Sequence, residues 1–124
     1  MEIINIENRY FFFDVKAVER EQENEDDPWW NVHVIYKTKC VNFEDFGETM
    51  TKNELLYTSD TIERYLINKE MEKISYIEPD YAIDLKEFFG KFIINLGYGD
   101  AINILLKREE LIKIKEVIDN VIRK

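Results

Sequence analysis

The chain has 124 residues, of which 45% are hydrophobic, with 17 Lys and Arg against 26 Asp and Glu. This composition predicts one globular domain over residues 1–124, and no apolar run approaches the roughly 18 residues that cross a bilayer. The net charge of −9 repels phosphate backbones and attracts basic proteins, so direct binding to nucleic acid is not expected.

The start of the chain predicts no export and no membrane contact. Residues 1–7 are acidic where a secretory signal is basic, and they lack a small-residue cleavage site, so we expect a cytoplasmic protein. Three isoleucines in this segment predict a short first strand or an extension of the strand that follows it: Ile3, Ile4 and Ile6.

Two strands are predicted from alternating patterns. From Tyr10 to Val18, apolar residues recur at every second position, with Asp14 and Lys16 on the opposite face: Phe11, Phe13, Val15 and Ala17. From about Trp29 to Cys40, one face is again apolar and is formed by Trp30, Val32, Val34 and Tyr36. We expect these two strands to pair in antiparallel fashion.

An acidic run connects the two strands. Residues 19–27 hold six acids and one Arg, so they carry −5 of the chain's net charge of −9. The run leads directly into Pro28, Trp29 and Trp30. A polar connection of about ten residues is long for a hairpin, and such loops often carry function. We interpret it as a binding surface, and a purely solubilising connection stays open as the alternative.

The middle of the chain contains a helix with an explicit start. Thr51 and Glu54 match a capping box, and Leu55, Ile62 and Leu66 then recur at helical spacing, which predicts a helix over residues 52–68. Residues 41–50 lack a clean period, and we interpret them as an irregular loop or a short extra strand.

The second half predicts short strands and a final helix. Strands are expected over residues 74–77, 81–85, 92–96 and 102–106, with turns at 88–91 and 97–100. Residues 108–123 form an amphipathic pattern, with Glu109 and Glu110 in the first turn where the helix dipole favours acids. The chain is therefore predicted to be α+β, with an antiparallel sheet of about six strands and two helices covering one face, in the order ββαββββα.

Catalytic chemistry is not apparent in the residues. His33 and Cys40 are the only histidine and cysteine, and along one strand they would lie about 23 Å apart on opposite faces. A lone cysteine excludes an internal disulfide, and we expect Cys40 to be a buried apolar filler. No spacing fits a zinc site, and the acidic run lacks the glycine of a calcium loop. We predict a protein that is not an enzyme and that binds no metal or cofactor.

Five segments, in this order, resemble the WapI-type family of bacterial immunity proteins: Phe13-Asp14-Val15, Pro28-Trp29-Trp30-Asn31-Val32-His33-Val34, Thr51-Lys52-Asn53-Glu54-Leu55, Tyr76-Ile77-Glu78-Pro79-Asp80-Tyr81 and Arg108-Glu109-Glu110-Leu111. The resemblance extends roughly from Tyr10 to Ile122. It implies a cytoplasmic inhibitor that binds the nuclease-like domain of a wall-associated contact-dependent toxin, and it transfers no catalytic residues.

The partner implied by the resemblance agrees with the charge of the chain, because toxins that cut RNA have basic clefts. The residues expected to contact it are the acids of the run and the first tryptophan: Glu21, Glu23, Glu25, Asp26, Asp27 and Trp29. Two other interpretations stay open at this point. One is a small structural or regulatory module that oligomerises through a sheet edge or the last helix. The other is a hydrolase or ligand-binding domain with an unrecognised pocket.

Overall fold

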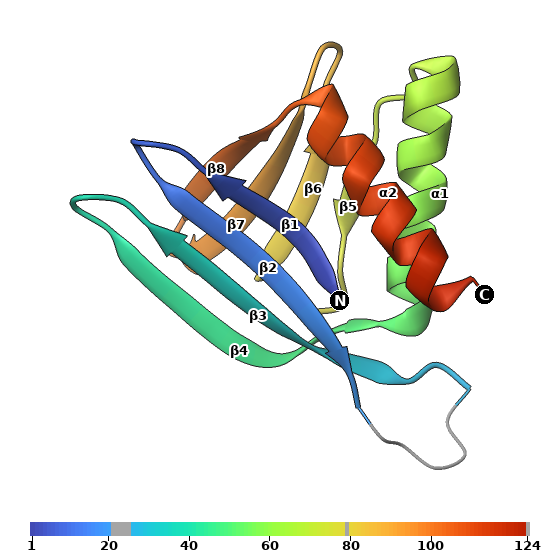
Figure 1. The fold of residues 1–124 in the computed structure, drawn as a ribbon, viewed down its shortest axis with the longest axis horizontal. Helices are drawn as coiled ribbons and strands as arrows, with labels where there is room; N and C mark the ends of the chain where they lie inside the picture. The colour runs from blue at the N-terminus through green and yellow to red at the C-terminus, as the bar shows by residue number, and fades with distance from the viewer. Residues whose placement is uncertain (21–25, 79, 124) are drawn as a thin grey trace.

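Ten elements follow one another in the order ββββαββββα in the computed structural model, which describes residues 1–20, 26–78 and 80–123 (Figure 1). The first five elements are β1 (Glu2–Glu7), β2 (Phe12–Glu19), β3 (Trp29–Lys37), β4 (Asn42–Thr51) and α1 (Lys52–Asn68). The last five are β5 (Lys73–Ser75), β6 (Tyr81–Leu85), β7 (Gly90–Gly97), β8 (Asp100–Leu106) and α2 (Arg108–Ile122).

The strands form two antiparallel sheets in which neighbours in the chain are neighbours in space. One sheet has the order β1-β2-β3-β4 and the other has the order β5-β6-β7-β8. The predicted α+β class and the antiparallel pairing of β2 with β3 are confirmed. The prediction of one sheet of about six strands in the order ββαββββα is wrong, because the described chain holds two four-stranded sheets.

Residues 41–50, interpreted from the sequence as an irregular loop or a short extra strand, lie almost entirely within β4, which spans ten residues. Its register with β3 places Asp45 opposite the buried Val34 and Gly47 opposite the buried Val32. Two inward positions are therefore not apolar, which hides the alternating pattern. Asp45 is accommodated because its Oδ2 accepts a hydrogen bond from the Tyr81 hydroxyl at 2.5 Å, and burial together with this bond raises the pKa of Tyr81.

The other strand boundaries differ modestly from the prediction. β1 is a strand of its own that pairs with β2 through a register shift between Glu2 and Ile4. β3 ends at Lys37, since the chain then turns back with the Thr38 N–H bonded to the Val41 carbonyl at 2.8 Å. β5 is only three residues long, so half of the predicted strand over residues 74–77 lies outside it.

The core lies between the inner faces of the two sheets. The rings of Phe13 on β2 and Phe92 on β7 have centroids 5.2 Å apart, and Phe92 also contacts the ring of Tyr81. Both helices lie together beside the sheets, and α2 runs along β1 (Figure 1). The buried face of α2 consists of Leu111, Ile114 and Ile118, which belong to the same hydrophobic cluster as the strands.

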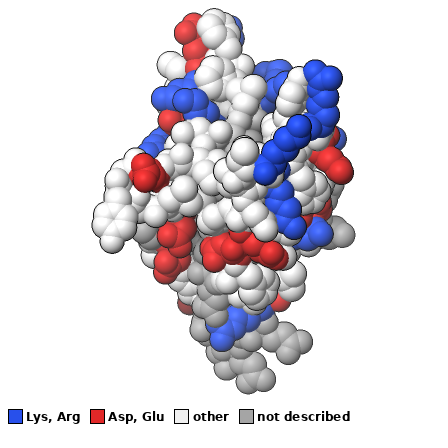
Figure 2. All heavy atoms as spheres, turned by 90° about the vertical axis from the view of Figure 1, so that its left-hand side faces the viewer, with Lys and Arg blue, Asp and Glu red and all other residues white. Residues whose placement is uncertain are grey.

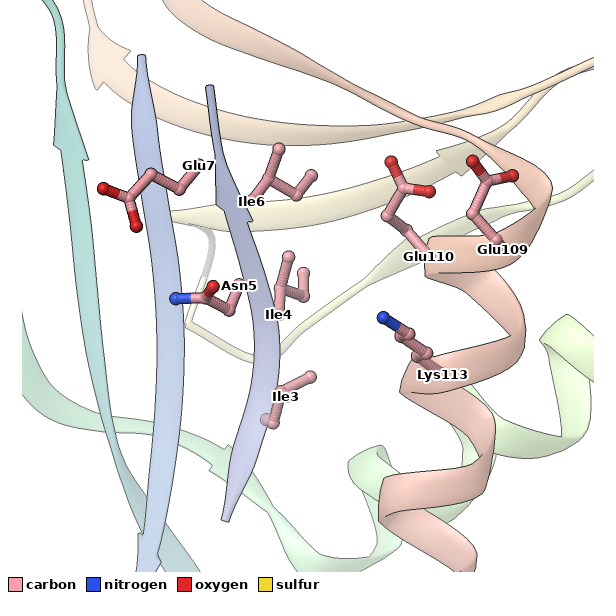
Figure 3. Close-up of a pocket in the computed structure, with 8 residues that line it drawn as sticks. All are labelled: Ile3, Ile4, Asn5, Ile6, Glu7, Glu109, Glu110 and Lys113. Carbon is pink, nitrogen blue, oxygen red and sulfur yellow. The ribbon is translucent and has the colours of Figure 1, made fainter. Parts of the chain in front are cut away.

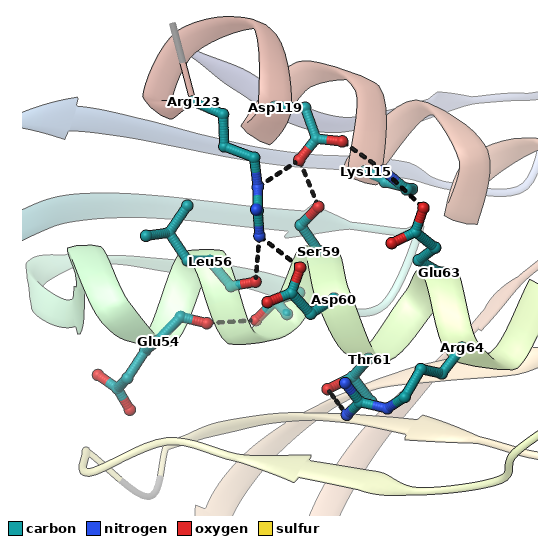
Figure 4. Close-up of polar contacts among 11 residues, drawn as sticks. Glu54, Leu56, Ser59, Asp60, Thr61, Glu63, Arg64, Lys115, Asp119 and Arg123 are labelled. Atoms are coloured by element: carbon teal, nitrogen blue, oxygen red, sulfur yellow. Dashed lines mark hydrogen bonds and ion pairs between the residues drawn. The ribbon is translucent and has the colours of Figure 1, made fainter.

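Both predicted helices are confirmed, and a polar network joins them (Figure 4). Asp119 of α2 accepts hydrogen bonds from the Ser59 hydroxyl of α1 at 2.5 Å and from Lys115, and Arg123 Nε lies 3.1 Å from it. Burial acts to raise the pKa of Asp119, but the bonds from Lys115 and Ser59 lower it below its usual value. Arg123 also forms a hydrogen-bonded ion pair with Asp60 of α1, so the end of α2 is fixed to α1.

Candidate functional site

Three of the predicted contact residues, Asp26, Asp27 and Trp29, are described, and they lie at one end of the first sheet, where the chain enters β3. Glu21, Glu23 and Glu25 lie outside the described residues. Asp26 is exposed, and Asp27 is half-buried. Trp29 is half-buried and opens β3 opposite Thr51, so the structure does not place it as a fully exposed anchor.

Asp27 has a structural role that sequence reasoning did not anticipate. Its Oδ1 accepts a hydrogen bond from the backbone N–H of Asn53 at 2.7 Å, in the first turn of α1. The next residue, Pro28, accepts a bond from the backbone N–H of Lys52 at 2.9 Å through its carbonyl. The end of the acidic run is therefore attached to a helix N-terminus, where a carboxylate is favoured by the unpaired N–H groups and the helix dipole.

A groove opens beside this attachment, and we call it the α1 groove. It has a volume of about 210 Å³, and its lining includes Asp27, Asn53, Glu54, Tyr57, Tyr76 and Ile77. Ile77 is 70% exposed and Tyr57 is 44% exposed. Large side chains with this exposure beside a cavity are typical of contact surfaces for other proteins.

Glu54 holds the α1 groove together. One carboxylate oxygen accepts the Thr51 N–H at 2.9 Å and completes the predicted capping box, while the Thr51 hydroxyl accepts the Glu54 N–H at 3.2 Å. The other oxygen accepts the N–H of Ile77 at 2.7 Å, which fixes the segment after β5 against the helix. The sequence predicted the capping box but not the bond to Ile77, because that bond joins residues far apart in the chain.

The floor of the α1 groove is rigid. Tyr76 is buried, its hydroxyl lies 2.9 Å from that of Thr58, and burial raises its pKa. At the rim, the Tyr57 hydroxyl donates to Glu72 at 2.5 Å. The two aromatic side chains are thus held by polar contacts within the protein, so the groove is largely preformed.

The first sheet carries charged residues at both ends of its strands. Asp26 and Asp27 lie at the end that bears the α1 groove, whereas the β1–β2 and β3–β4 turns at the opposite end contribute Arg9 and Lys39 to a cavity of about 500 Å³. Figure 2 faces the strand tips on the left-hand side of Figure 1, and Lys and Arg side chains gather along the right of that view. The face that holds these tips therefore carries charges of both signs.

The two residues considered for nucleophilic chemistry do not converge. The half-buried His33 lies within β3, where its Nε2 is 2.7 Å from Glu44 Oε1 and its ring contacts Phe46. Cys40 is exposed in the turn between β3 and β4, so the prediction of a buried filler is wrong. The turn keeps Cys40 outside the strand and its packing. Among the described residues, no group of three or more His, Cys, Asp or Glu side chains could hold a metal ion.

The carboxyl groups of Glu2 and Asp14 form a pair on the outer face of β1 and β2 that was not predicted from the sequence. Asp14 is only 2% exposed, and it accepts a bond from Asn5 Nδ2 at 3.0 Å. Burial and the neighbouring Asp14 raise the pKa of Glu2 to about 7. Burial opposes ionisation of Asp14 as well, but its hydrogen bonds with Glu2 and Asn5 and the charge of Lys16 lower its pKa.

The comparisons with known proteins leave the family unassigned. No protein-family model matches the chain, and no curated protein or solved structure is significantly similar to it. Membership of the WapI-type immunity family therefore stays a prediction based on sequence resemblance. Within the described residues, neither helix has the length and apolar character required to cross a membrane.

Proposed function

We propose that the protein is a non-catalytic immunity protein of the cytoplasm, which binds and neutralises a basic, nuclease-like toxin domain. The observation that carries the proposal is the α1 groove, in which exposed Ile77 and Tyr57 lie beside the end of the acidic run. Apolar anchors provide affinity at a protein interface, and surrounding acids speed the encounter with a basic partner and select for it.

The resemblance to immunity proteins agrees with this location. Three of the five segments that carry the resemblance contribute residues next to or within the α1 groove: 28–34, 51–55 and 76–81. They are far apart in the chain, and contacts of Pro28 and Glu54 bring them together. Asp27 and Glu54 are already bonded to backbone N–H groups, so their contribution to binding is through charge.

The test begins with the gene that adjoins the coding sequence. If that gene encodes a secreted toxin, its C-terminal domain is produced together with this protein, and cell survival and co-purification are measured. We expect protection and a one-to-one complex. A chain that neither protects nor co-purifies with the neighbouring toxin domain would contradict the proposal.

The contact surface is tested with two sets of charge variants. Replacing Glu21, Glu23 and Glu25 with Gln removes three acids of the run, and the control replaces the exposed Glu87, Asp100 and Glu116 with their amides. We expect the first set to weaken toxin binding by about tenfold and to reduce its salt dependence, because it removes charge near the partner. The control is expected to stay within about twofold. Equal effects of both sets would contradict this contact surface.

The apolar part of the groove needs its own variant. Ile77→Ser removes an exposed side chain while leaving the backbone N–H that Glu54 accepts. We expect binding to weaken by at least about tenfold with little change in stability, since hot spots at interfaces commonly lose this much on truncation. The control is Ile67→Ser, which removes an equally exposed isoleucine near the other end of α1.

An oligomerising module is the second candidate, and one observation favours it. The outer face of the first sheet exposes Val18 (59%) and Phe46 (63%). Exposed apolar side chains on a sheet face fit contact with a second copy. Sedimentation of the wild type and of Phe46→Ser distinguishes the candidates, because a tight dimer that the substitution dissolves supports this second function.

A further inference from the structure

A second cavity lies at the free edge of the first sheet, between β1 and the beginning of α2 (Figure 3). Its volume is about 280 Å³, and it is lined by β1 residues 3–7 and by Glu109, Glu110 and Lys113 of α2. β1 is the outermost strand of its sheet, so only one of its two edges is paired. This cavity is distinct from the α1 groove, with which it shares no lining residue.

The backbone of β1 forms one wall of the cavity. Figure 3 shows the side chains of Asn5 and Glu7 pointing away from α2, so these two residues line the cavity with main-chain atoms. The Asn8 N–H is bonded to the Phe11 carbonyl, and Asn8 and Phe11 therefore start the ladder with β2. In an antiparallel sheet, residues whose backbone groups bond to the neighbouring strand alternate with residues whose backbone groups point the other way. Counted from Asn8 in this register, the N–H and C=O groups of Asn5 and Glu7 therefore point toward the free edge.

The opposite wall supplies charge. Glu110 and Lys113 project from α2 on the side that faces β1 (Figure 3). Glu110 Oε2 is buried and has no hydrogen-bond donor among the described residues, and Lys113 forms no ion pair within that part of the chain. A carboxylate with one oxygen buried and without a donor gains from a nearby positive charge, and a cationic side chain that enters the cavity would supply that charge to the Glu110 carboxylate.

These features select an extended peptide over a small molecule. The cavity opens along the edge of β1, whose outward N–H and C=O groups suit another backbone better than a compact ligand. A peptide strand can use both walls, because its backbone pairs with an unpaired edge while one side chain enters the cavity. The inner side of the cavity is apolar, with Ile4 and Ile6 from β1.

We infer that the free edge of β1 beside the first turn of α2 binds an extended peptide segment carrying a lysine or arginine side chain. The segment pairs with the backbone of Asn5 and Glu7, and its cation binds the Glu110 carboxylate. Lys113 donates to a carbonyl of the bound segment. This inference does not depend on the proposed toxin, because it concerns another surface and is tested with another ligand.

The probe is a fluorescent peptide of eight residues in which lysine alternates with valine, and binding is measured by anisotropy at low salt. One matched peptide carries acetyl-lysine, and a second carries N-methyl groups on the amides of one edge. We expect each change to weaken binding by at least about fivefold, since one removes the cation and the other removes the strand pairing. Equal binding of all three peptides, or no binding of the first at millimolar concentration, would overturn the inference.

Protein variants test the same contacts from the other side. Glu110→Gln should weaken binding of the lysine peptide by about fivefold, whereas Glu116→Gln, farther along α2, should change it by less than twofold. Glu7→Pro removes an outward N–H and should abolish binding, while Glu7→Ala keeps it and should not. If Glu7→Pro does not fold, the N-methylated peptide still tests that bond.

A second copy of the chain is the other possible occupant of this edge. A concentration-dependent dimer that Glu7→Pro dissolves and Glu110→Gln leaves intact would show that β1 pairs with itself. That result would overturn the assignment to a basic segment. Amide chemical shifts of Asn5 and Glu7 that move on addition of the lysine peptide to a monomer would support it.

Discussion

The two helices begin differently, although both carry acids in the first turn. At α1, Thr51 and Glu54 form a reciprocal capping box, and Asp27 adds a third bond from another part of the chain. At α2, the N-cap residue is Lys107, whose side chain makes no capping bond. Glu110 nearby has a buried oxygen without a donor among the described residues.

The difference shows how similar acids serve different purposes. The acids at α1 are bonded to backbone N–H groups and join the helix to the β2–β3 connection and to the segment after β5. The start of α2 is instead anchored by packing, because Leu111 contacts β7 so closely that a Cβ at Gly90 would lie 3.2 Å from its Cδ2. Glu110, whose buried oxygen has no donor among the described residues, is left available to a partner.

The strongest test of this comparison is Glu54→Ala. We expect the free energy of unfolding to fall by about 2 to 3 kcal/mol, because the substitution removes the acceptor for two backbone N–H groups, one of which is the Thr51 N–H of the capping box. Glu109→Ala is the matched control in the first turn of α2, and it should change stability by less than about 0.5 kcal/mol. Urea denaturation measures the stability of both variants. Equal losses of stability would contradict the difference between the two helix starts.

Asp27→Ala is expected to have the next largest effect. Its carboxylate accepts the Asn53 N–H at 2.7 Å, so its loss should cost about 1 kcal/mol. The neighbouring exposed Asp26, replaced by Ala, serves as the control and should be nearly neutral. If Asp26→Ala destabilised the protein as much as Asp27→Ala, general charge rather than capping would explain the effect.

Adding a cap to α2 should reduce the difference between the helices. Lys107 has an extended backbone with φ −73° and ψ 170°, which suits an N-cap residue. Lys107→Ser should therefore raise the free energy of unfolding by about 0.5 to 1 kcal/mol, since a serine hydroxyl can accept from the first turn. Lys107→Ala removes the same lysine without adding an acceptor, and denaturation of both variants isolates the cap.

The carboxyl pair of Glu2 on β1 and Asp14 on β2 makes the stability of the protein depend on pH. The pKa of Glu2 is raised from 4.5 to about 7 in the folded protein, so the folded state binds its proton more tightly than the unfolded state. The stability from this group is present below about pH 4.5 and is lost as the pH rises through about 7. Because the Glu2 side chain is 43% exposed, we expect this loss to be below about 1 kcal/mol.

Glu2→Gln tests this dependence directly. The amide stays neutral and can still donate to Asp14, so the variant should lose less stability than the wild type between pH 5 and 8. Asp14 has the opposite sign, because its lowered pKa gives stability that is lost as the pH falls through its folded value. The pKa of Glu2 is measured from its carboxyl resonance by NMR. A pKa near the ordinary value of a glutamate would contradict the interaction between Glu2 and Asp14.

The candidate sites were only partly predictable from the sequence. Asp27 and Trp29 were expected near a binding surface and do lie beside or near the α1 groove. Tyr57 gave no sequence signal, and Ile77 belonged to a segment of the family resemblance but was not predicted as a contact residue. The edge of β1 was also missed, since a strand pattern does not say which strand of a sheet is outermost.

The sequence by itself determined both helices, the α+β class and most strands, because capping and hydrophobic periodicity are local properties. Only the tertiary structure decided that residues 42–51 form a full strand, β4, whose inward Asp45 is satisfied by Tyr81 from the other sheet. It also decided the division into two sheets, the burial of Asp14 and the bond from Ile77 to Glu54. These features depend on packing between distant segments, and the periodicity of one segment carries no information about its partner.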